Sequence, residues 1–121
     1  VVGVDQDGPP IIKNTLATGR PAKLDILDTI ADGLAAPFVG QHNLEHAQAF
    51  VDEVVLVNDE DIVQAMRMIL DRAKILAEPS AAATYAAILS GKIRISNGAT
   101  VVCILSGGNV DTSRLVGLLS D

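Results

Sequence analysis

Short apolar, β-branched runs alternate with longer stretches of helical spacing, and this alternation is the feature that most constrains the fold. Three runs predict strands, at residues 1–5, 52–57 and 101–105. Strands separated by helices pair in parallel and carry helices on both faces of the sheet. We therefore expect an α/β fold with three layers, a mostly parallel sheet flanked by helices, in a single domain over residues 1–121.

Helical signals fill the segments between the strands. Helices are expected over 10–18, briefly within 28–40, over 43–50, 58–76 and 80–89, and from residue 112 to the C-terminus. Gly19 should close the first of these helices, and Asn58, followed by three acids, should cap the helix over 58–76. Asp111 should cap the last helix, and Pro79 should separate the two helices on either side of it.

Charge and composition exclude several classes of protein. Nine basic and fifteen acidic residues give a net charge of −6, which disfavours nucleic acid or an anionic membrane surface as a partner. Charges interrupt every apolar run well before the roughly 18 residues of a membrane span. A cytoplasmic protein is expected, with the one cysteine, Cys103, as a small buried residue. Because the chain opens on an apolar run without methionine, we expect a chain cut from a longer one.

The segment "VVCILSGGNVD" ends a predicted strand on Ser106, Gly107, Gly108 and Asn109. In parallel sheets, ligands bind beyond the carboxyl ends of the strands, where this turn is expected to lie. One interpretation is that the glycines supply unusual backbone angles in a strand-to-helix turn. The other is that they let a flat ligand approach the backbone while Ser106 offers it a hydroxyl. The turn by itself does not decide between them.

Three further segments occur with this turn in a fixed order: "TIADGLA" at 29–35, "VDEVVLVNDEDI" at 51–62 and "ILAEPSAAATYAAIL" at 75–89. In this order and spacing the chain resembles the pyridoxal-phosphate-dependent threonine and serine dehydratases and the related serine racemases. The resemblance covers nearly every residue and corresponds to the C-terminal part of their catalytic domain. It implies a partial large domain of a fold type II enzyme and a small-molecule amino-acid substrate, L-threonine or L-serine.

The resemblance also implies roles for particular residues. Cofactor-binding positions would be Ser106, Gly107, Gly108, Asn109, Gly33 and Glu78. Ser106 would face the pyridine nitrogen with a neutral hydroxyl, which makes the ring a weaker electron sink and favours β-elimination. Asp32 would line the substrate pocket. From local sequence alone, Asp32 would be a helix cap or surface acid, and Glu78 an ordinary residue of a last helical turn.

A divalent cation is a further expectation from the resemblance. Relatives often bind magnesium or calcium through an acid that ends the first strand and a second acid about six residues later. Asp5 keeps the first position, whereas Ile11 stands at the second, so Asp7 would have to substitute. His42 and His46 are spaced i, i+4, but an exposed helix face is expected for them rather than a zinc site.

Two elements of the family's site are missing from this sequence. The family carries a lysine that bonds the cofactor covalently and a glycine-rich loop that holds its phosphate. Lys13, Lys23, Lys74 and Lys92 stand in no matching context, so they are expected at the surface. We therefore predict no catalytic residue and no dehydratase activity in this chain alone. An amino-acid racemase and a free-standing, non-catalytic α/β binding module stay as alternatives, and a homo-oligomer is expected for the full-length enzyme.

Overall fold

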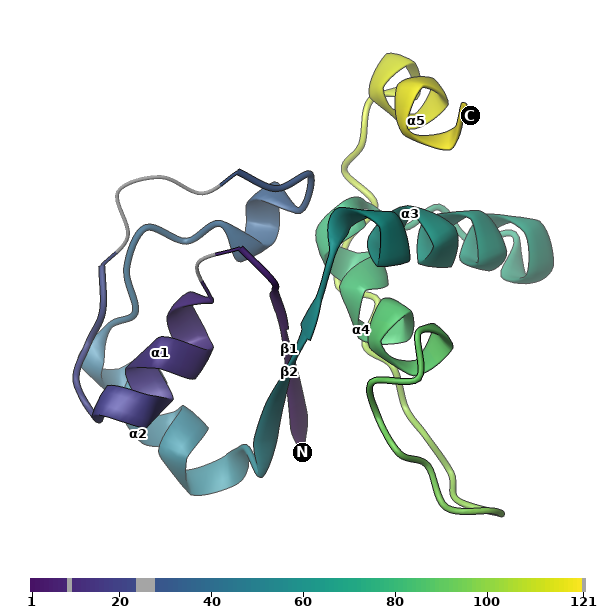
Figure 1. Cartoon of the computed structure of the whole chain (residues 1–121). Helices are drawn as coiled ribbons and strands as arrows, with labels where there is room; N and C mark the ends of the chain where they lie inside the picture. The colour runs from purple at the N-terminus through teal and green to yellow at the C-terminus, as the bar shows by residue number, and fades with distance from the viewer. Residues whose placement is uncertain (9, 24–27, 121) are drawn as a thin grey trace.

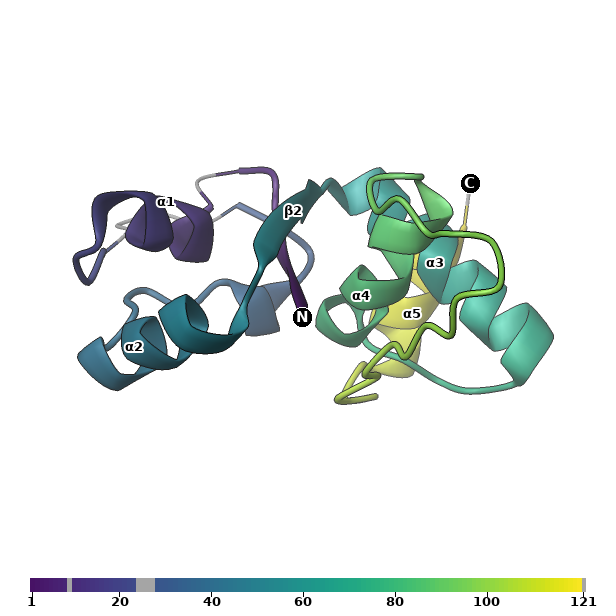
Figure 2. The same cartoon turned by 90° about the horizontal axis from the view of Figure 1, so that it is seen from below.

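A two-stranded parallel sheet separates two groups of helices in this protein, as a computed structural model shows (Figures 1 and 2). The structure describes residues 1–8, 10–23 and 28–120. Strands β1 (Val2–Gln6) and β2 (Glu53–Val57) pair in register, with Val4 opposite Val55. The helix–sheet–helix layering confirms the predicted α/β class and its parallel pairing.

Helices lie on both sides of this sheet. They are α1 (Ile11–Thr18), the 3-10 helix η1 (Asp32–Leu34), α2 (Gln41–Phe50), α3 (Asp59–Met68), the π-helical turn η2 (Ile69–Ala73), α4 (Pro79–Leu89) and α5 (Thr112–Leu119). Helices α1 and α2 pack together on one side of the sheet, and α4 covers the other side with α3 packed on it. The last helix, α5, packs on α3 rather than on the strands. No helix in the described ranges is long and apolar enough to span a membrane.

The larger core lies between α4 on one side and α3 and the sheet on the other. Five alanines of α4 are buried there against Val57, Ile62 and Met66. Because alanine adds only a methyl group, α4 approaches the sheet and α3 closely. A smaller cluster of Ile11, Val39 and Leu44 joins α1 to α2. Helices α1 and α2 thus form the layer on one side of the short sheet, and α4, with α3 packed on it, forms the layer on the other.

Helix termini follow the local signals in the sequence. Asn58 Oδ1 accepts a hydrogen bond from the Asp61 N–H at 2.8 Å, and Asp61 reaches back to the Asn58 N–H, which forms a capping box for α3. Gly19 closes α1 in the left-handed conformation, with φ 65°. Both helix boundaries confirm the predictions. Asp111 occupies the N-cap position of α5 as expected, but its side chain accepts no capping hydrogen bond.

The helix expected over 58–76 ends early. Regular α-helix stops at Met68, η2 continues to Ala73, and Lys74 turns the chain with φ 58°. Pro79 then occupies the first position of α4 rather than breaking a helix, because a residue there needs no intrahelical N–H bond. The apolar spacing that continues to Leu76 therefore falls on an irregular connection and not on another helical turn.

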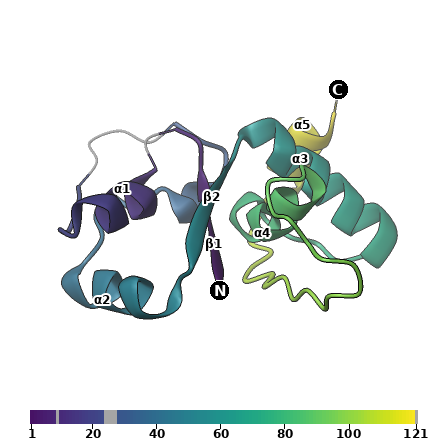
Figure 3. The same cartoon turned by 60° about the horizontal axis from the view of Figure 1, so that its bottom comes forward.

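The prediction of a strand over residues 101–105 is wrong for this chain. Figures 1 and 3 show this segment as an extended trace with no strand arrow. Thr84 anchors it from α4, since its Oγ1 donates to the Ile104 carbonyl at 3.2 Å. A strand requires a neighbouring strand for its backbone groups, and within the described residues β1 and β2 pair only with each other. Val102 is consequently 83% exposed instead of buried.

Candidate functional site

The ADG turn of η1 is fastened at both of its ends. At one end the Asp59 carboxylate, which follows β2, accepts hydrogen bonds from Thr29 Oγ1 at 2.7 Å and from the Ile30 N–H. At the other end the Gly33 N–H donates to Ser80 Oγ at 2.8 Å. Both strands run toward the end of the molecule where η1 and the start of α3 lie (Figure 1). The ADG turn is therefore held at the carboxyl edge of the sheet.

The SGGN turn, residues 106–109, is fastened to the residue that precedes α4. Glu78 Oε2 accepts a hydrogen bond from the Asn109 N–H at 2.8 Å, and the Glu78 N–H donates to the Gly107 carbonyl at 3.1 Å. Glu78 is the N-cap residue of α4, and Ser80 lies two residues further on. The first turn of α4 thus holds the ADG turn through Ser80 and the SGGN turn through Glu78.

A guanidinium group closes the arrangement from α5. Arg114 donates from Nη1 to Asp32 Oδ2 at 2.9 Å and from Nη2 to the Ile30 carbonyl at 2.7 Å. The hydrogen bond from Arg114, and then its charge, lower the pKa of the exposed Asp32 carboxyl below its usual value. Asp32 therefore carries its negative charge at neutral pH, paired with a cation from the same chain.

Ser106 begins the SGGN turn with an exposed side chain. Among the residues that the structure describes, none forms a hydrogen bond with the Ser106 hydroxyl. A hydroxyl can both donate and accept, so this group is free to bond a ring nitrogen or another polar atom of a ligand. The Ser106 hydroxyl is therefore the candidate ligand-binding group of the turn.

The two glycines of the turn are explained by the protein's own packing. Neither has a positive φ, so the interpretation that they supply unusual backbone angles is not supported. A Cβ atom on Gly107 would lie 2.7 Å from Glu78 Oε1, and one on Gly108 would lie 2.6 Å from the Leu76 carbonyl oxygen. Both distances are too short for non-bonded atoms. The glycines let the turn lie directly against residues 76–78.

Sequence reasoning found most of this cluster but missed two members. The structure brings Asp32, Gly33, Glu78 and the 106–109 turn together around the start of α4, as their shared place in the resemblance implies. Ser80 and Arg114 were not predicted. Ser80 had a usable signal, since only Pro79 separates it from Glu78. Arg114 had none, because its partner Asp32 lies 82 residues away in the sequence.

The two carboxylates expected to hold a cation are Asp5, which bonds the protein backbone instead, and Asp7. Asp5 is 3% exposed, and its Oδ2 accepts a hydrogen bond from the Ile12 N–H at 3.1 Å, at the start of α1. Burial raises the pKa of the Asp5 carboxyl, against the opposing effect of three backbone N–H groups. Asp7 is exposed. Within residues 1–8, 10–23 and 28–120, no three His, Cys, Asp or Glu side chains could share a metal ion. The cation expected at Asp5 and Asp7 is not supported.

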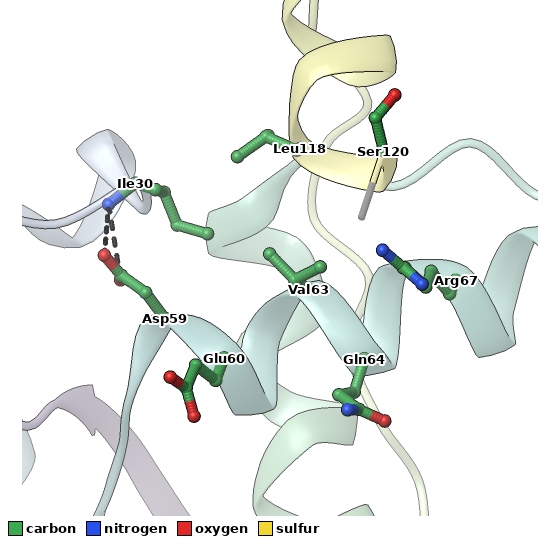
Figure 4. Close-up of a pocket in the computed structure, with 8 residues that line it drawn as sticks. All are labelled: Ile30, Asp59, Glu60, Val63, Gln64, Arg67, Leu118 and Ser120. Carbon is green, nitrogen blue, oxygen red and sulfur yellow. Dashed lines mark hydrogen bonds between the residues drawn. The ribbon is translucent and has the colours of Figure 1, made fainter.

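A cavity of about 380 Å³ lies between α3 and the end of α5, apart from the SGGN turn (Figure 4). Asp59 and Ile30 stand at one end of it, joined by their hydrogen bonds, and Arg67 and Ser120 stand at the other. Its described lining includes none of the positions predicted to bind the cofactor, the substrate or a metal. The polar cluster at the start of α4, and not this cavity, is the candidate site.

The remaining expectations concern single side chains. Lys13, Lys23, Lys74 and Lys92 are all exposed, as predicted, and Lys92 pairs with Asp61 at 3.0 Å. His42 and His46 lie on the exposed face of α2. Cys103 is half-buried rather than buried, and burial raises the pKa of its thiol. None of these groups lies in the described contacts of the candidate site.

The fold belongs to a cofactor-dependent class of enzyme. Residues 1–107 match the model of the pyridoxal-phosphate-dependent enzyme family, and the chain belongs to that family. It is 35% identical to the L-threonine ammonia-lyase of Geobacter sulfurreducens over 115 residues, which are 95% of this chain and 28% of that protein. The chain thus spans between a quarter and a third of the length of this curated relative.

Solved structures agree with the sequence match. A threonine deaminase from the organism abbreviated T.th. superposes with a TM-score of 0.85 at 32% identity, over 93% of this chain and 41% of that one. Maize serine racemase superposes with a TM-score of 0.85 at 34% identity, over 96% of this chain and 36% of that one. The fold is therefore that of the fold type II pyridoxal-phosphate enzymes, and the predicted resemblance is confirmed.

Proposed function

We propose that this chain forms one wall of the active site in a pyridoxal-phosphate-dependent ammonia-lyase, within a single domain over residues 1–121. The substrate would be L-threonine or L-serine, and the products a 2-oxo acid and ammonia. The observation that carries the proposal is the convergence of the ADG and SGGN turns on the first turn of α4, through Ser80 and Glu78. The first turn of α4 therefore holds, two residues apart, the two turns that the resemblance assigns to one site.

The residues present fit the cofactor at the exposed Ser106 hydroxyl. In the proposal, this hydroxyl bonds the pyridine nitrogen, and Gly107, Gly108, Asn109 and Gly33 form backbone beside the ring. When bound, pyridoxal phosphate withdraws electrons from the α-carbon of an amino acid and so labilises its α-proton. A neutral hydroxyl does not hold the ring nitrogen protonated as a carboxylate would. Ser106 therefore limits the lifetime of negative charge at the α-carbon, which favours loss of the β-hydroxyl.

The other residues of the site act by position. Arg114 holds the ionised Asp32 and the Ile30 carbonyl, so the wall that faces the substrate keeps one shape. Fixed charges and dipoles stabilise a reaction without having to reorganise during it. All four lysines of the sequence are exposed away from this cluster, so in the proposal the α-proton of the substrate passes to a group contributed by other polypeptide.

The test is an assay of the full-length protein for 2-oxo acid release from L-threonine and L-serine, with added pyridoxal phosphate. We expect release from at least one substrate, and none from the 121-residue chain alone. No release from either substrate by a full-length protein that binds the cofactor would overturn the proposal. The reading frame upstream of Val1 separates the enzyme from a free-standing binding module, which would begin at a start codon there.

A racemase is the second candidate, because maize serine racemase superposes as closely as the threonine deaminase does. A racemase needs a second acid–base group on the opposite face of the substrate, which other polypeptide would have to contribute. Chiral analysis of the serine recovered from the same assay separates the two activities. Accumulation of D-serine faster than 2-oxo acid would assign the racemase.

Three further features complete the proposal. We expect a homo-oligomer, which the sedimentation of the full-length protein would test. We expect a cytoplasmic location, since a single, half-buried cysteine is typical of chains from reducing compartments. A divalent cation is not part of the proposal, because the Asp5 carboxylate is used at the start of α1.

A further inference from the structure

The SGGN turn packs against residues 76–78. Three contacts define this packing: the Asn109 N–H donates to Glu78 Oε2, the Glu78 N–H donates to the Gly107 carbonyl, and the Leu76 carbonyl faces Gly108. The first two contacts use both the side chain and the backbone of Glu78. Glu78 therefore holds the turn on both sides of Gly108, at Gly107 and Asn109, and Gly107 directly follows Ser106.

The two glycines of the turn lie against different parts of residues 76–78, one against a side chain and the other against backbone. The obstacle to a side chain on Gly107 is the Glu78 carboxylate, with Oε1 at 2.7 Å from an added Cβ. The obstacle at Gly108 is backbone, the Leu76 carbonyl oxygen at 2.6 Å. A carboxylate can be removed by substitution, whereas a backbone carbonyl cannot. The pair therefore offers an internal comparison that isolates the contribution of Glu78.

We propose that Glu78 is a positioning residue for Ser106, and that it acts by holding the Asn109 N–H and the Gly107 carbonyl rather than by binding the cofactor, the role that the resemblance implied for it. The importance of Ser106 in this inference rests on the proposed function. Hydrogen bonds to an ionised acceptor are roughly twice as strong as neutral ones, so a carboxylate here fixes the turn firmly. Glutamine keeps an acceptor oxygen of the same reach and should retain part of the hold.

The first experiment measures amide hydrogen exchange over residues 106–110 in the full-length protein. Glu78→Ala should speed exchange of the Asn109 amide by about tenfold or more, since it loses a hydrogen bond to a charged group. Glu78→Gln should speed it by about threefold, since a neutral bond remains. Gly117→Ala is the matched control, because a Cβ on Gly117 of α5 meets nothing within 4 Å. Its exchange over 106–110 should equal that of the wild type.

The second experiment is a pair of double-substitution cycles, read as the dissociation constant for pyridoxal phosphate. Gly107→Ala should weaken binding in the wild type but by less than about twofold in the Glu78→Ala background, where the carboxylate is gone. Gly108→Ala should weaken binding equally in both backgrounds, because the Leu76 carbonyl remains. If the alanine variant at 78 does not fold, Glu78→Gln is compared with wild type by amide exchange and by cofactor affinity. Faster exchange of the Asn109 amide together with weaker binding supports the proposal, and wild-type values for both overturn it.

Two results would overturn it. Unchanged exchange of the Asn109 amide in Glu78→Ala would show that Glu78 does not hold the turn. Normal exchange in Glu78→Gln with cofactor affinity as poor as in Glu78→Ala would show that the charge acts on the cofactor directly. If the wild-type protein binds no pyridoxal phosphate, the proposed function fails, whereas the exchange measurements still decide whether Glu78 positions the turn.

Discussion

Three of the four carboxylates predicted to bind a ligand each have a partner inside the chain. Asp5 accepts from the Ile12 N–H, Asp32 pairs with Arg114, and Glu78 accepts from the Asn109 N–H. A carboxylate that already satisfies a backbone donor or a guanidinium stabilises the local chain conformation first. At this scale, Ser106 stands out because its hydroxyl has no such partner among the described residues.

The proposed role of Ser106 gives a prediction about the fate of the substrate. Ser106→Asp in the full-length protein would place a carboxylate beside the ring nitrogen and favour its protonated form. Negative charge at the α-carbon would then last longer, so racemisation and other side reactions should gain on elimination. We expect the ratio of side products to 2-oxo acid to rise about tenfold, equivalent to ~1.4 kcal/mol between the two barriers. An unchanged ratio would count against Ser106 as the partner of the ring nitrogen.

The buried Asp5 gives a prediction about pH. Its folded-state pKa is raised above 3.8. Between pH 3.8 and this raised pKa, the folded protein therefore binds more protons than the unfolded one. The contribution of Asp5 to stability therefore falls as pH rises. Relative to Asp5→Asn, the free energy of unfolding of the wild type should decline as pH rises through 3.8 and the raised pKa, by at most about 1.4 kcal/mol per pH unit. Denaturant titration at several pH values measures the difference, and an increase with pH would contradict it.

At the scale of elements, local sequence signals predicted those helix boundaries that depend only on residues close in the sequence. Gly19 and Asn58 mark real helix boundaries because each satisfies backbone groups within a few residues. The run at 101–105 has the composition of a buried strand, but pairing depends on a neighbour that the run itself does not specify. The ion pair of Arg114 with Asp32 was unpredictable for the same reason, since it joins residues far apart in sequence.

The candidate site divides in the same way. The resemblance located both turns and Glu78, and the structure brings them together. The resemblance did not indicate that contacts with Glu78 and Leu76 require glycine at 107 and 108, because such contacts follow from three-dimensional packing. A sequence pattern identifies a glycine but not the atom that excludes its side chain.

The capping box of α3 yields a prediction at this scale. Asn58→Ala removes the acceptor of the Asp61 N–H and should lower the free energy of unfolding by about 1 kcal/mol. Asp111→Ala is the matched comparison, since Asp111 holds the same position in α5 without a capping hydrogen bond. It should have the smaller effect, and Asn58→Asp should stay close to the wild type. Equal losses for the two alanine variants, measured by chemical denaturation, would mean that the capping bond contributes little.

For the whole molecule, one apolar surface has no cover among the described residues. Val102 and Ile104 are exposed, as are Val1 and Val2, and together they line a hollow of about 620 Å³. Isolated apolar side chains at a surface are ordinary, but a contiguous group of this kind marks an interaction surface. Since the chain spans 28% of the length of the Geobacter relative, we expect further polypeptide of the same protein to cover this surface in the full-length enzyme.

This expectation can be tested by comparing two valines. Their exposure in this chain predicts one order of tolerance to lysine, and a covered hollow predicts the reverse order. In the described chain Val102 is 83% exposed and Val116, on α5, is 59% exposed, so this chain alone predicts that lysine is better tolerated at 102. If the hollow is covered, Val102→Lys in the full-length protein should lose at least about 1.5 kcal/mol, the value of burying a valine side chain. Val116→Lys should change stability by about 0.5 kcal/mol or less, as surface substitutions do. Chemical denaturation of the two variants decides between them, because a smaller loss at 102 than at 116 would leave the 101–104 segment a solvent-facing edge in the complete enzyme.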